Sequence, residues 1–293
     1  MKRRDFLKLA GAASLAGCAT PTPSKARVVV IGGGFGGATA AKYIRLWDPS
    51  IDVVLIEREP QFVSCPFSNL VLGGFASMAQ LTHGYDGLRR HGVQVVRDEV
   101  TAVDAAKKTV SLARGGEVGY ERLIVSPGID FMFEDIQGYE SAMQGGAVLH
   151  AWKAGPQTVA LRRQLEEMRD GGVYVIGVPM LPYRCTPGPY ERATMVAAYL
   201  KQAKPRSKVL VLDANPDVTS KGGLFKAAWK DLYGGMVEHQ GNAKVVSVAA
   251  GSVRTEFDTV RGDVLNIVPP HRAGDIAAKS GLITHNSRWC DVD

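Results

Sequence analysis

The sequence has few cysteines and only a modest excess of charge. None of its four cysteines, Cys18, Cys65, Cys185 and Cys290, forms a CxxC pair, so a zinc site is not expected. The formal net charge is +6, and residues 1–17 carry three of these charges. The remainder is too weak to indicate nucleic-acid binding, and no basic stripe interleaved with aromatics is present. The length of 293 residues, with 45% apolar and 22% charged residues, is typical of a globular protein of about two domains.

The amino-terminal region lacks a run long enough to span a bilayer. Arg3-Arg4-Asp5-Phe6-Leu7-Lys8 is a twin-arginine pattern, and the apolar run that follows, residues 9–17, is too short for a transmembrane helix. We therefore predict a twin-arginine export signal in residues 1–24 and a periplasmic location. The alternative is an amino-terminal core helix.

Cys18 has two interpretations. Leu15-Ala16-Gly17-Cys18 resembles a bacterial lipobox, in which Cys18 would carry a lipid anchor to the membrane. Alternatively, Cys18 lies by chance in an alanine-rich cleavage region. Export implies an oxidising compartment, where disulfides persist. Three cysteines remain without Cys18, so at least one of them is unpaired or has another role.

Residues 27–57 have the pattern of a βαβ unit. Residues 27–31 and 53–56 are apolar and β-branched, as in buried parallel strands, and residues 36–47 form a helical stretch between them. Further strand-like segments lie at residues 93–96, 109–112 and 123–125, and Gly115-Gly116 predicts a turn between two of them. Residues 61–92 resemble a loop region with short helical pieces.

A glycine motif lies in the turn of this unit. Gly32, Gly34 and Gly37 satisfy GxGxxG, in which the glycines permit a tight turn, close approach of a pyrophosphate, and close packing of helix on strand. Glu57 ends the second strand, where an acidic residue would bind ribose hydroxyls. This context predicts dinucleotide binding. The alternative is a structural glycine turn with Glu57 as a surface charge.

A second βαβ unit begins with the strand at residues 173–177. A helix at residues 193–202 and a strand at residues 208–213 follow, and a helix at residues 160–168 precedes it. The turn after Gly177 holds prolines and bulky residues instead of the second and third glycines, so backbone amides could not line a pyrophosphate there. We infer that this domain keeps its fold and has lost NAD.

The segment from Tyr120 to Gly128 indicates which cofactor the first unit holds. It resembles the strand-to-glycine segment that closes the first dinucleotide domain of the flavoprotein disulfide-reductase superfamily. In that superfamily the amino-terminal motif binds FAD and the inner one binds NAD. The resemblance implies FAD in the first unit, with Gly128 among the binding residues.

Two cysteines are candidates for redox chemistry. Cys185 lies at the mouth of the altered site, next to the start of a helix whose amino terminus is expected to lower the pKa of the thiol. Glu191, in the first helical turn, could handle protons. The alternatives are a structural cysteine and a charge favoured by the helix dipole. Cys65 follows the second strand near the expected flavin ring, where it could attack the flavin, pair with another cysteine, or be a small apolar residue.

Several longer segments are similar to the flavoprotein subunit of flavocytochrome c sulfide dehydrogenase. Beyond the Arg-Arg-Asp-Phe signal, the matching stretches are residues 36–44, 83–89, 150–155, 185–193 and 267–274, with Trp289-Cys290. The resemblance implies that Cys65 forms a thioether to FAD, that Cys185 is half of a redox-active disulfide, and that Glu191 is an acid close to it. The implied activity is oxidation of hydrogen sulfide, with electrons passing through FAD to a c-type cytochrome subunit.

The resemblance also has a limit. Chains of that family continue with a Gly-Asp strand that contacts the cofactor, a second disulfide cysteine and a domain that docks the cytochrome, whereas this sequence stops at Asp293. The expectation is a truncated or split product in which Cys290 or a second polypeptide would supply the partner of Cys185. Alternatives are a sulfide:quinone reductase-like enzyme or other exported flavin disulfide oxidoreductase, and a non-catalytic FAD-binding remnant.

The predicted fold is α/β, with two nested Rossmann-like dinucleotide-binding domains as in flavoprotein disulfide reductases, and without the carboxyl-terminal interface domain. The domains are expected to be the signal at residues 1–24, the first part of the FAD domain at 25–150, the degenerate NAD-like domain at 151–240, and an incomplete return to the FAD domain at 241–293.

Overall fold

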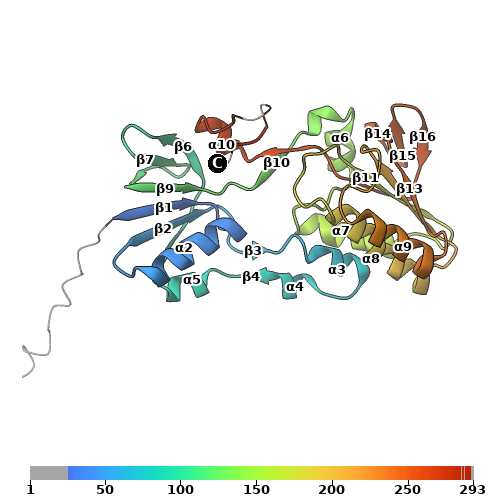
Figure 1. Cartoon of the computed structure of the whole chain (residues 1–293), viewed down its shortest axis with the longest axis horizontal. Coiled ribbons are helices and arrows are strands. Elements are labelled where there is room, and N and C mark those ends of the chain that lie inside the picture. Colours follow the sequence, from blue (N-terminus) through green and yellow to red (C-terminus); the bar gives the residue numbers. More distant parts are fainter. Residues whose placement is uncertain (1–25, 285, 287, 292–293) are drawn as a thin grey trace, which may run out of the picture.

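The computed structural model describes residues 26–284, 286 and 288–291. The predicted signal and Cys18 lie outside the described residues. Two parallel four-stranded sheets lie at opposite ends of the molecule, and segments of irregular chain with short strands join them (Figure 1). The predicted α/β fold with two dinucleotide-type units is therefore confirmed. In the part of the chain that the structure describes, no helix is both long and apolar enough to cross a membrane.

The first sheet has the strand order β5-β2-β1-β9, with every neighbouring pair parallel. Its strands are β1 (Arg27–Ile31), β2 (Asp52–Glu57), β5 (Gln94–Arg97) and β9 (Arg122–Val125), and α2 (Phe35–Trp47) connects β1 to β2. Side chains of β1 alternate between two apolar clusters: Val28 and Val30 pack on one face, Val29 and Ile31 on the other. Burial on both faces explains why this strand is a continuous β-branched run.

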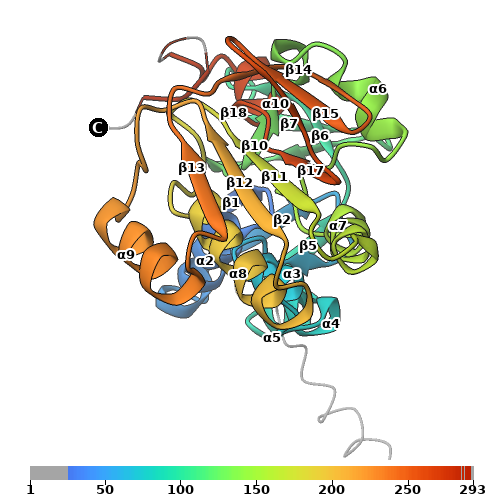
Figure 2. The ribbon, with the colours of Figure 1, turned by 90° about the vertical axis from the view of Figure 1, so that its right-hand side faces the viewer.

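The second sheet has the order β13-β12-β11-β17 and is also parallel. Its elements are α7 (Pro156–Glu167), β11 (Val173–Val178), α8 (Gly188–Ala203), β12 (Lys208–Asp213), α9 (Gly222–Tyr233), β13 (Val237–Gln240) and β17 (Val264–Ile267). The three helices cover one face, where Leu161, Val196 and Trp229 join one apolar cluster (Figure 2). Because β17 pairs with β11, this sheet extends past residue 240, the boundary predicted from the sequence.

The structure also has two three-stranded antiparallel sheets. Their strands are β6 (Val100–Asp104), β7 (Thr109–Leu112) and β8 (Glu117–Gly119) in one, and β14 (Val245–Ala249), β15 (Ser252–Thr255) and β16 (Thr259–Arg261) in the other. The sequence predicted β7 but neither β6 nor β8. Gly115-Gly116 therefore joins β7 to β8, not to the strand at 123–125 as expected. Short strands with one exposed face carry a weak apolar pattern, which explains the omission.

The chain passes between the two sheets through a pair of antiparallel strands. β10 (Ile129–Phe131) leads toward the second sheet and β18 (His271–Ala273) returns beside it, with Phe131 opposite His271. The remaining elements are β3 (Phe62–Val63), α3 (Ser68–Gly73), α4 (Met78–Leu81), β4 (Thr82–His83), α5 (Asp86–Arg90), η1 (Phe133–Asp135), α6 (Tyr139–Gln144) and α10 (Asp275–Lys279). α3 packs against α7 and α8, so residues 61–92 also reach the second unit.

Candidate active site

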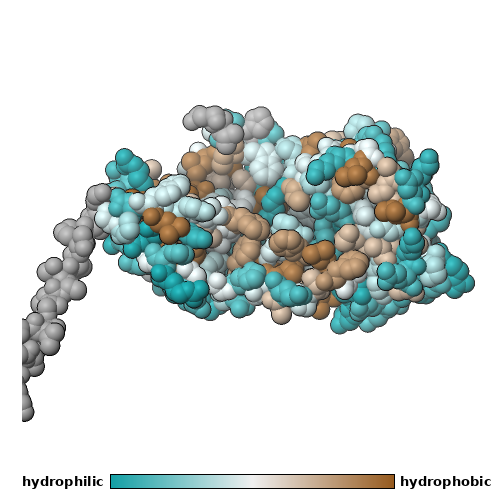
Figure 3. All heavy atoms as spheres, turned by 60° about the horizontal axis from the view of Figure 1, so that its bottom comes forward, coloured by the Kyte–Doolittle hydropathy of each residue, from teal (hydrophilic) through white to brown (hydrophobic). Residues whose placement is uncertain are grey.

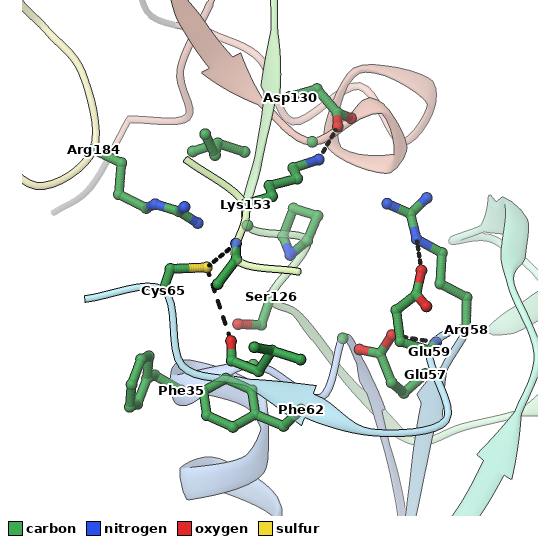
Figure 4. A pocket seen from close by; sticks show the side chains of 18 of the residues that line it. Phe35, Glu57, Arg58, Glu59, Phe62, Cys65, Ser126, Asp130, Lys153 and Arg184 are labelled. Atoms are coloured by element: carbon green, nitrogen blue, oxygen red, sulfur yellow. Dashed lines mark hydrogen bonds and ion pairs between the residues drawn. The ribbon is translucent and has the colours of Figure 1, made fainter. Parts of the chain in front are cut away.

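A cavity of about 990 Å³ lies between the two units. Its wall begins at the β1–α2 turn and the end of β2, continues along residues 126–130, and ends at the start of α8. Figure 4 shows part of this wall, with Glu57, Ser126, Cys65 and Arg184 labelled. Its volume is at the upper end of the range found for sites that hold extended small molecules and cofactors. Six of the residues predicted from the sequence line it: Gly32, Gly34, Glu57, Cys65, Gly128 and Cys185.

The glycines of the first turn serve different purposes. Gly32 has a φ of +95°, and a Cβ there would lie 2.2 Å from the carbonyl oxygen of Ser126. A Cβ at Gly37 would lie 1.9 Å from the carbonyl oxygen of Gly32, so no side chain fits between helix and strand. A Cβ at Gly34 would meet no atom within 4 Å, so this position opens directly onto the cavity. The turn therefore fits a pyrophosphate group at Gly34.

Glu57 closes the same end of the cavity. The Gly33 N–H donates to Glu57 Oε2 at 2.6 Å, and the Glu59 N–H donates to Glu57 Oε1 at 2.8 Å. These bonds hold the carboxylate beside the glycine turn, as expected for an acid that binds ribose hydroxyls. The hydroxyl of Tyr85 donates to the Gly33 carbonyl at 3.3 Å, and burial followed by the charge of Glu57 raises the pKa of this phenol.

Gly128 lies where the chain leaves the first sheet. It has a φ of +69°, and nothing lies within 4 Å of a Cβ placed there, so its backbone is open to the cavity. Its carbonyl accepts a hydrogen bond from the Gly274 N–H at 3.1 Å. Gly274 and Asp275 also line the cavity, so a Gly-Asp pair lies beside the predicted cofactor site within the described residues.

Cys65 lies at the opposite end of the cavity, after β3. Its Sγ accepts a hydrogen bond from the Ala154 N–H at 3.5 Å and lies 3.8 Å from the carbonyl of Val63 (Figure 4). The side chain is half-buried, and the sulfur is not in a disulfide. Phe35 and Phe62 lie nearby in an edge-to-face contact, with ring centroids 5.0 Å apart. Figure 3 shows apolar surface across the middle of one face, and Phe35, Phe67 and Phe75 are among the exposed large apolar side chains.

Cys185 lies on the wall formed by the start of α8. Its φ of +66° is the left-handed conformation, which costs a non-glycine residue about 1 kcal/mol. Desolvation and then the charge of Glu191 raise the pKa of the thiol above its usual value. The helix amino terminus, visible in the sequence, predicts a lowered pKa, and that prediction is wrong. The Gly188 backbone does act in that direction, but it does not outweigh the other two effects.

Glu191 is not part of the cavity wall. It is exposed in the first turn of α8, and its backbone N–H donates to the Pro187 carbonyl at 3.0 Å. The structure therefore brings Glu191 close enough to Cys185 to act on its charge, but not into the cavity itself.

Arg192, which was not predicted from the sequence, lines the cavity with only 1% of its surface exposed. Its guanidinium donates to Asn69 Oδ1 at 2.9 Å, to Asn266 Oδ1 at 3.0 Å, and to the carbonyls of His150 and Ala151, both at 2.8 Å. These acceptors come from α3, β17 and the segment before α7. The sequence shows only an arginine one helical turn after Gly188, and this pattern is equally typical of an exposed helix, so it did not indicate a buried cavity residue.

Two buried histidines flank this region in their neutral form. Burial, reinforced by nearby cations, lowers the pKa of His150 and of His271 to about 3. His150 Nδ1 accepts the Trp152 N–H, and His271 Nδ1 accepts the Arg184 N–H, both at 2.9 Å. His271 Nε2 is buried without a hydrogen-bond partner among the described residues.

The second unit has its own acidic residue at the position equivalent to Glu57. Asp213 ends β12 and is fully buried. Its Oδ2 accepts the Tyr190 hydroxyl at 2.7 Å and lies 3.0 Å from His239 Nε2, while its Oδ1 accepts both nitrogens of Asn215. In the second unit, the strand-to-helix connection from β11 to α8 takes up residues 179–187. The equivalent connection from β1 to α2 in the first unit consists only of Gly32–Gly34. The protein itself therefore satisfies the carboxylate that a ribose would use.

The fold and this cavity agree with comparisons to known proteins. Residues 26–177, slightly more than half of the chain, match the family model for pyridine nucleotide-disulphide oxidoreductases, and the chain belongs to that family. Residues 158–269 match the central part of the sulfide dehydrogenase (flavocytochrome c) flavoprotein chain. Within the family, the chain is thus a relative of that flavoprotein, and this relationship implies flavin binding.

Individual relatives support the same placement. The sulfide dehydrogenase (flavocytochrome c) flavoprotein chain of Chlorobaculum thiosulfatiphilum is 67% identical over 45 residues, which are 15% of this chain and 94% of that curated sequence. The mitochondrial sulfide:quinone oxidoreductase of Dictyostelium discoideum is 22% identical over 281 residues, covering 91% of this chain. This chain spans 61% of that longer relative.

A solved structure shows the same fold. The sulfide:quinone oxidoreductase of Aquifex aeolicus superimposes with a TM-score of 0.77 at 18% identity, over 89% of this chain and 63% of the other. At this identity the likeness concerns the fold, so what the two proteins act on is a separate question.

Proposed function

We propose that this chain is the flavoprotein component of a sulfide-oxidising enzyme that passes electrons through FAD to a c-type cytochrome. The observation that carries the proposal is one cavity with a glycine turn and Glu57 at one end and two free cysteines, Cys65 and Cys185, at the other. The match of residues 158–269 to the flavocytochrome c flavoprotein supports the sulfide substrate and the cytochrome partner.

The residues present fit FAD. Gly32, Gly34 and the start of α2 would hold the pyrophosphate, and Glu57 would bind the ribose. Gly128 would contact the part of the cofactor that lies between the glycine turn and the cysteine end of the cavity. Cys65 would form the thioether that fixes the cofactor covalently. Bound FAD would accept the two electrons that leave each sulfide and pass them to the cytochrome.

Cys185 is assigned to the reaction with sulfide. Hydrosulfide would attack Cys185 in its disulfide form, leaving a persulfide on Cys185 and releasing the partner cysteine as a thiolate. Cys65, Cys185 and Cys290 are all free in the described part of the chain. We propose as the partner either Cys290, after rearrangement, or a cysteine outside the described residues, including one of a second polypeptide. Glu191 would handle the proton of the incoming sulfide.

The test combines one variant with two readouts. Cys185→Ser is expected to abolish sulfide-dependent reduction of a c-type cytochrome while the bound flavin is retained. Cys290→Ser separates the candidate partners, because turnover is lost if Cys290 pairs with Cys185 and is retained if another cysteine does. Unchanged turnover in Cys185→Ser would overturn the assignment, and loss of flavin would show that the residue has a structural role.

A sulfide:quinone reductase-like activity is the second candidate, because relatives of that kind align over 91% of this chain. Supplying a short-chain quinone and a c-type cytochrome separately, with sulfide as donor, distinguishes the two acceptors. Bleaching of the flavin band by sulfide would also exclude the third possibility, a non-catalytic FAD-binding remnant.

We also propose export to the periplasm by the twin-arginine route. The support is the Arg3-Arg4 pattern and the short apolar run after it. Changing both arginines to lysine should keep the chain in the cytoplasm. If Cys18 carries a lipid, Cys18→Ser should move the protein from the membrane to the soluble fraction.

A further inference from the structure

Arg192 carries a buried charge that the protein does not neutralise. All four of its hydrogen-bond acceptors are neutral amide or carbonyl oxygens. Among the described residues, no carboxylate forms an ion pair with it. A buried cation normally has a carboxylate partner, because removing a lone charge from water is expensive. Four good hydrogen bonds hold this guanidinium in place and leave its charge available to the cavity.

Arg184 is a second cation on the same wall. Its guanidinium donates to the Trp152 carbonyl at 3.3 Å, and its backbone N–H is held by His271. Figure 4 shows its side chain reaching into the cavity toward the Cys65 end. Within the described part of the chain it likewise forms no ion pair.

Trp152 places both arginines beside Cys185. The Arg192 guanidinium lies 4.9 Å from the centre of the Trp152 ring system. A Cβ at Gly188 would lie 2.8 Å from Trp152 Cη2 and 3.1 Å from Cys185 Sγ, so ring and sulfur meet at the first residue of α8. Both arginines act electrostatically on the Cys185 sulfur.

The other ionisable groups around Cys185 do not neutralise the positive charge of the two arginines. Lys153 is paired with Asp130 at 2.7 Å, and His150 and His271 are neutral because burial depresses their pKa. Tyr174 donates its hydroxyl to Asn266, and burial raises its pKa, so it remains uncharged. Glu191 is the one carboxylate acting on Cys185 among the described residues, and it is exposed. The cysteine end of the cavity is therefore net positive.

We propose that Arg184 and Arg192 form an anion-binding wall beside Cys185, which receives the sulfur substrate as a small monoanion, hydrosulfide, in preference to neutral thiols. The identity of this ligand rests on the proposed function, whereas the anion preference follows from the two side chains. A fixed guanidinium pair of this kind attracts a negative reactant before contact and orients it toward the cysteine.

Two alkylating reagents of similar size but different charge measure this preference directly. Iodoacetate is an anion and iodoacetamide is neutral, and both attack the same thiolate, so the ratio of their rates at Cys185 does not depend on the pKa of the thiol. The purified chain, with its cysteines reduced, is treated with each reagent at low ionic strength, and the Cys185 peptide is followed by mass spectrometry.

The ratio is expected to fall about fivefold in Arg184→Gln and in Arg192→Gln, the scale of one nearby charge in a partly solvated site. Arg192→Lys, which keeps the charge, should retain most of the ratio. Arg162→Gln is the matched control, because Arg162 also lies against an aromatic ring but is paired with Glu166 and does not line the cavity. Added salt should reduce the ratio of the unmodified chain.

Unchanged ratios in Arg184→Gln would overturn the proposal. This half-buried side chain makes the decisive variant if Arg192→Gln does not fold, which thermal unfolding of each variant would reveal. The measurement needs neither sulfide turnover nor a cytochrome. A chain with the expected ratios but no sulfide oxidation would therefore refute the proposed function and leave the anion site intact.

Discussion

The hydroxyl of Tyr190 donates a 2.7 Å hydrogen bond to Asp213, the carboxylate that ends β12. Together with His239 and Asn215, Tyr190 occupies the carboxylate oxygens of Asp213, to which the ribose hydroxyls of a nicotinamide dinucleotide would otherwise bind. We therefore expect neither NADH nor NADPH to bleach the flavin band, even in large excess over protein. Rapid reduction by either nucleotide would show that the second unit still serves as its donor site.

The same contact has a measurable energy. Tyr190→Phe should lower the free energy of unfolding by about 1–3 kcal/mol, because it removes a hydrogen bond to a buried charged group. Tyr43→Phe on the exposed face of α2 is the control and should change it by less than about 0.5 kcal/mol. Denaturant titration measures both, and equal small losses would argue against the buried bond.

Alanine substitutions should separate the glycines of the first turn. Gly34→Ala should fold, since nothing lies within 4 Å of the new methyl group, but should bind less flavin because the methyl occupies the pyrophosphate approach. Gly37→Ala should lose about 3 kcal/mol or more of stability, because its Cβ would lie 1.9 Å from a backbone oxygen. The flavin-to-protein absorbance ratio and thermal unfolding measure the two effects.

Gly223→Ala in α9 is the control for this pair. No atom lies within 4 Å of its added methyl group, and alanine favours helix, so a gain of up to about 1 kcal/mol is expected with no change in flavin content. Full flavin content in Gly34→Ala would contradict the assigned pyrophosphate site.

The covalent attachment to Cys65 gives a direct prediction. After acid precipitation the flavin should stay in the pellet of the unmodified chain, and Cys65→Ser should release it to the supernatant. Cys290→Ser, which changes an exposed cysteine away from the cavity wall, should keep it in the pellet. Release of flavin from the unmodified chain would exclude the thioether.

Stability should fall on acidification below neutral pH. The folded-state pKa of about 3 for His150 and His271 lies below the unfolded value of about 6.5, so the unfolded chain binds protons that the folded chain excludes. Their stabilising contribution is complete above the unfolded pKa and is lost as pH falls from about 6.5 toward 3. Each histidine contributes a slope of about 1.4 kcal/mol per pH unit in that window.

Substitution can assign part of this slope. His271→Gln should remove about half of the histidine contribution to the slope measured by denaturant titration from neutral to acidic pH. Gln144→Ala, at the exposed end of α6, removes no titratable group and should leave the slope unchanged. An unaltered slope in His271→Gln would mean that this imidazole is already charged in the folded protein.

Glu191 should control the thiol of Cys185. Because its carboxylate raises the pKa of that thiol, Glu191→Gln should shift the pH profile of iodoacetamide alkylation at Cys185 to lower pH. Glu140→Gln, which removes a carboxylate from the first turn of α6, should leave the profile in place. A shift to higher pH would reverse the sign of the interaction.

The parallel strands could be predicted from the sequence because burial on both faces imposes a simple pattern. Residues 27–31 and 208–213 are apolar and β-branched, and the structure forms strands over those residues. α8 begins at Gly188, five residues before the predicted start at 193, since prolines near a helix amino terminus are compatible with its first turn. Among the strands that were missed after residue 214, β17 and β18 pair with β11 and β10, which lie far away in the chain. β14, β15 and β16 pair with their neighbours, but they are short and carry only a weak apolar pattern.

The predicted site was incomplete for a similar reason. Gly32, Gly34, Glu57 and Cys65 follow local patterns that chemistry makes recognisable. The role of Arg192 depends on Asn69 and Asn266, which lie 123 and 74 residues away in the sequence, so no local signal distinguished it from a surface arginine. Likewise, the desolvation that raises the pKa of Cys185 arises from tertiary packing, whereas the helix terminus that lowers it is visible in the sequence.

The pairing of Phe131 with His271 has a consequence for how this architecture changes in evolution. The chain enters and leaves the second sheet through two adjacent antiparallel strands, so residues 132–270 are joined covalently to the first unit at one place. Outside this insertion, α3 packs against α7 and α8. An inserted domain whose two ends lie side by side can be replaced, enlarged or lose its own ligand site while the fold that carries it is retained. Such a chain can change its electron donor through substitutions in the inserted second unit, while the cofactor-binding residues of the first unit stay the same.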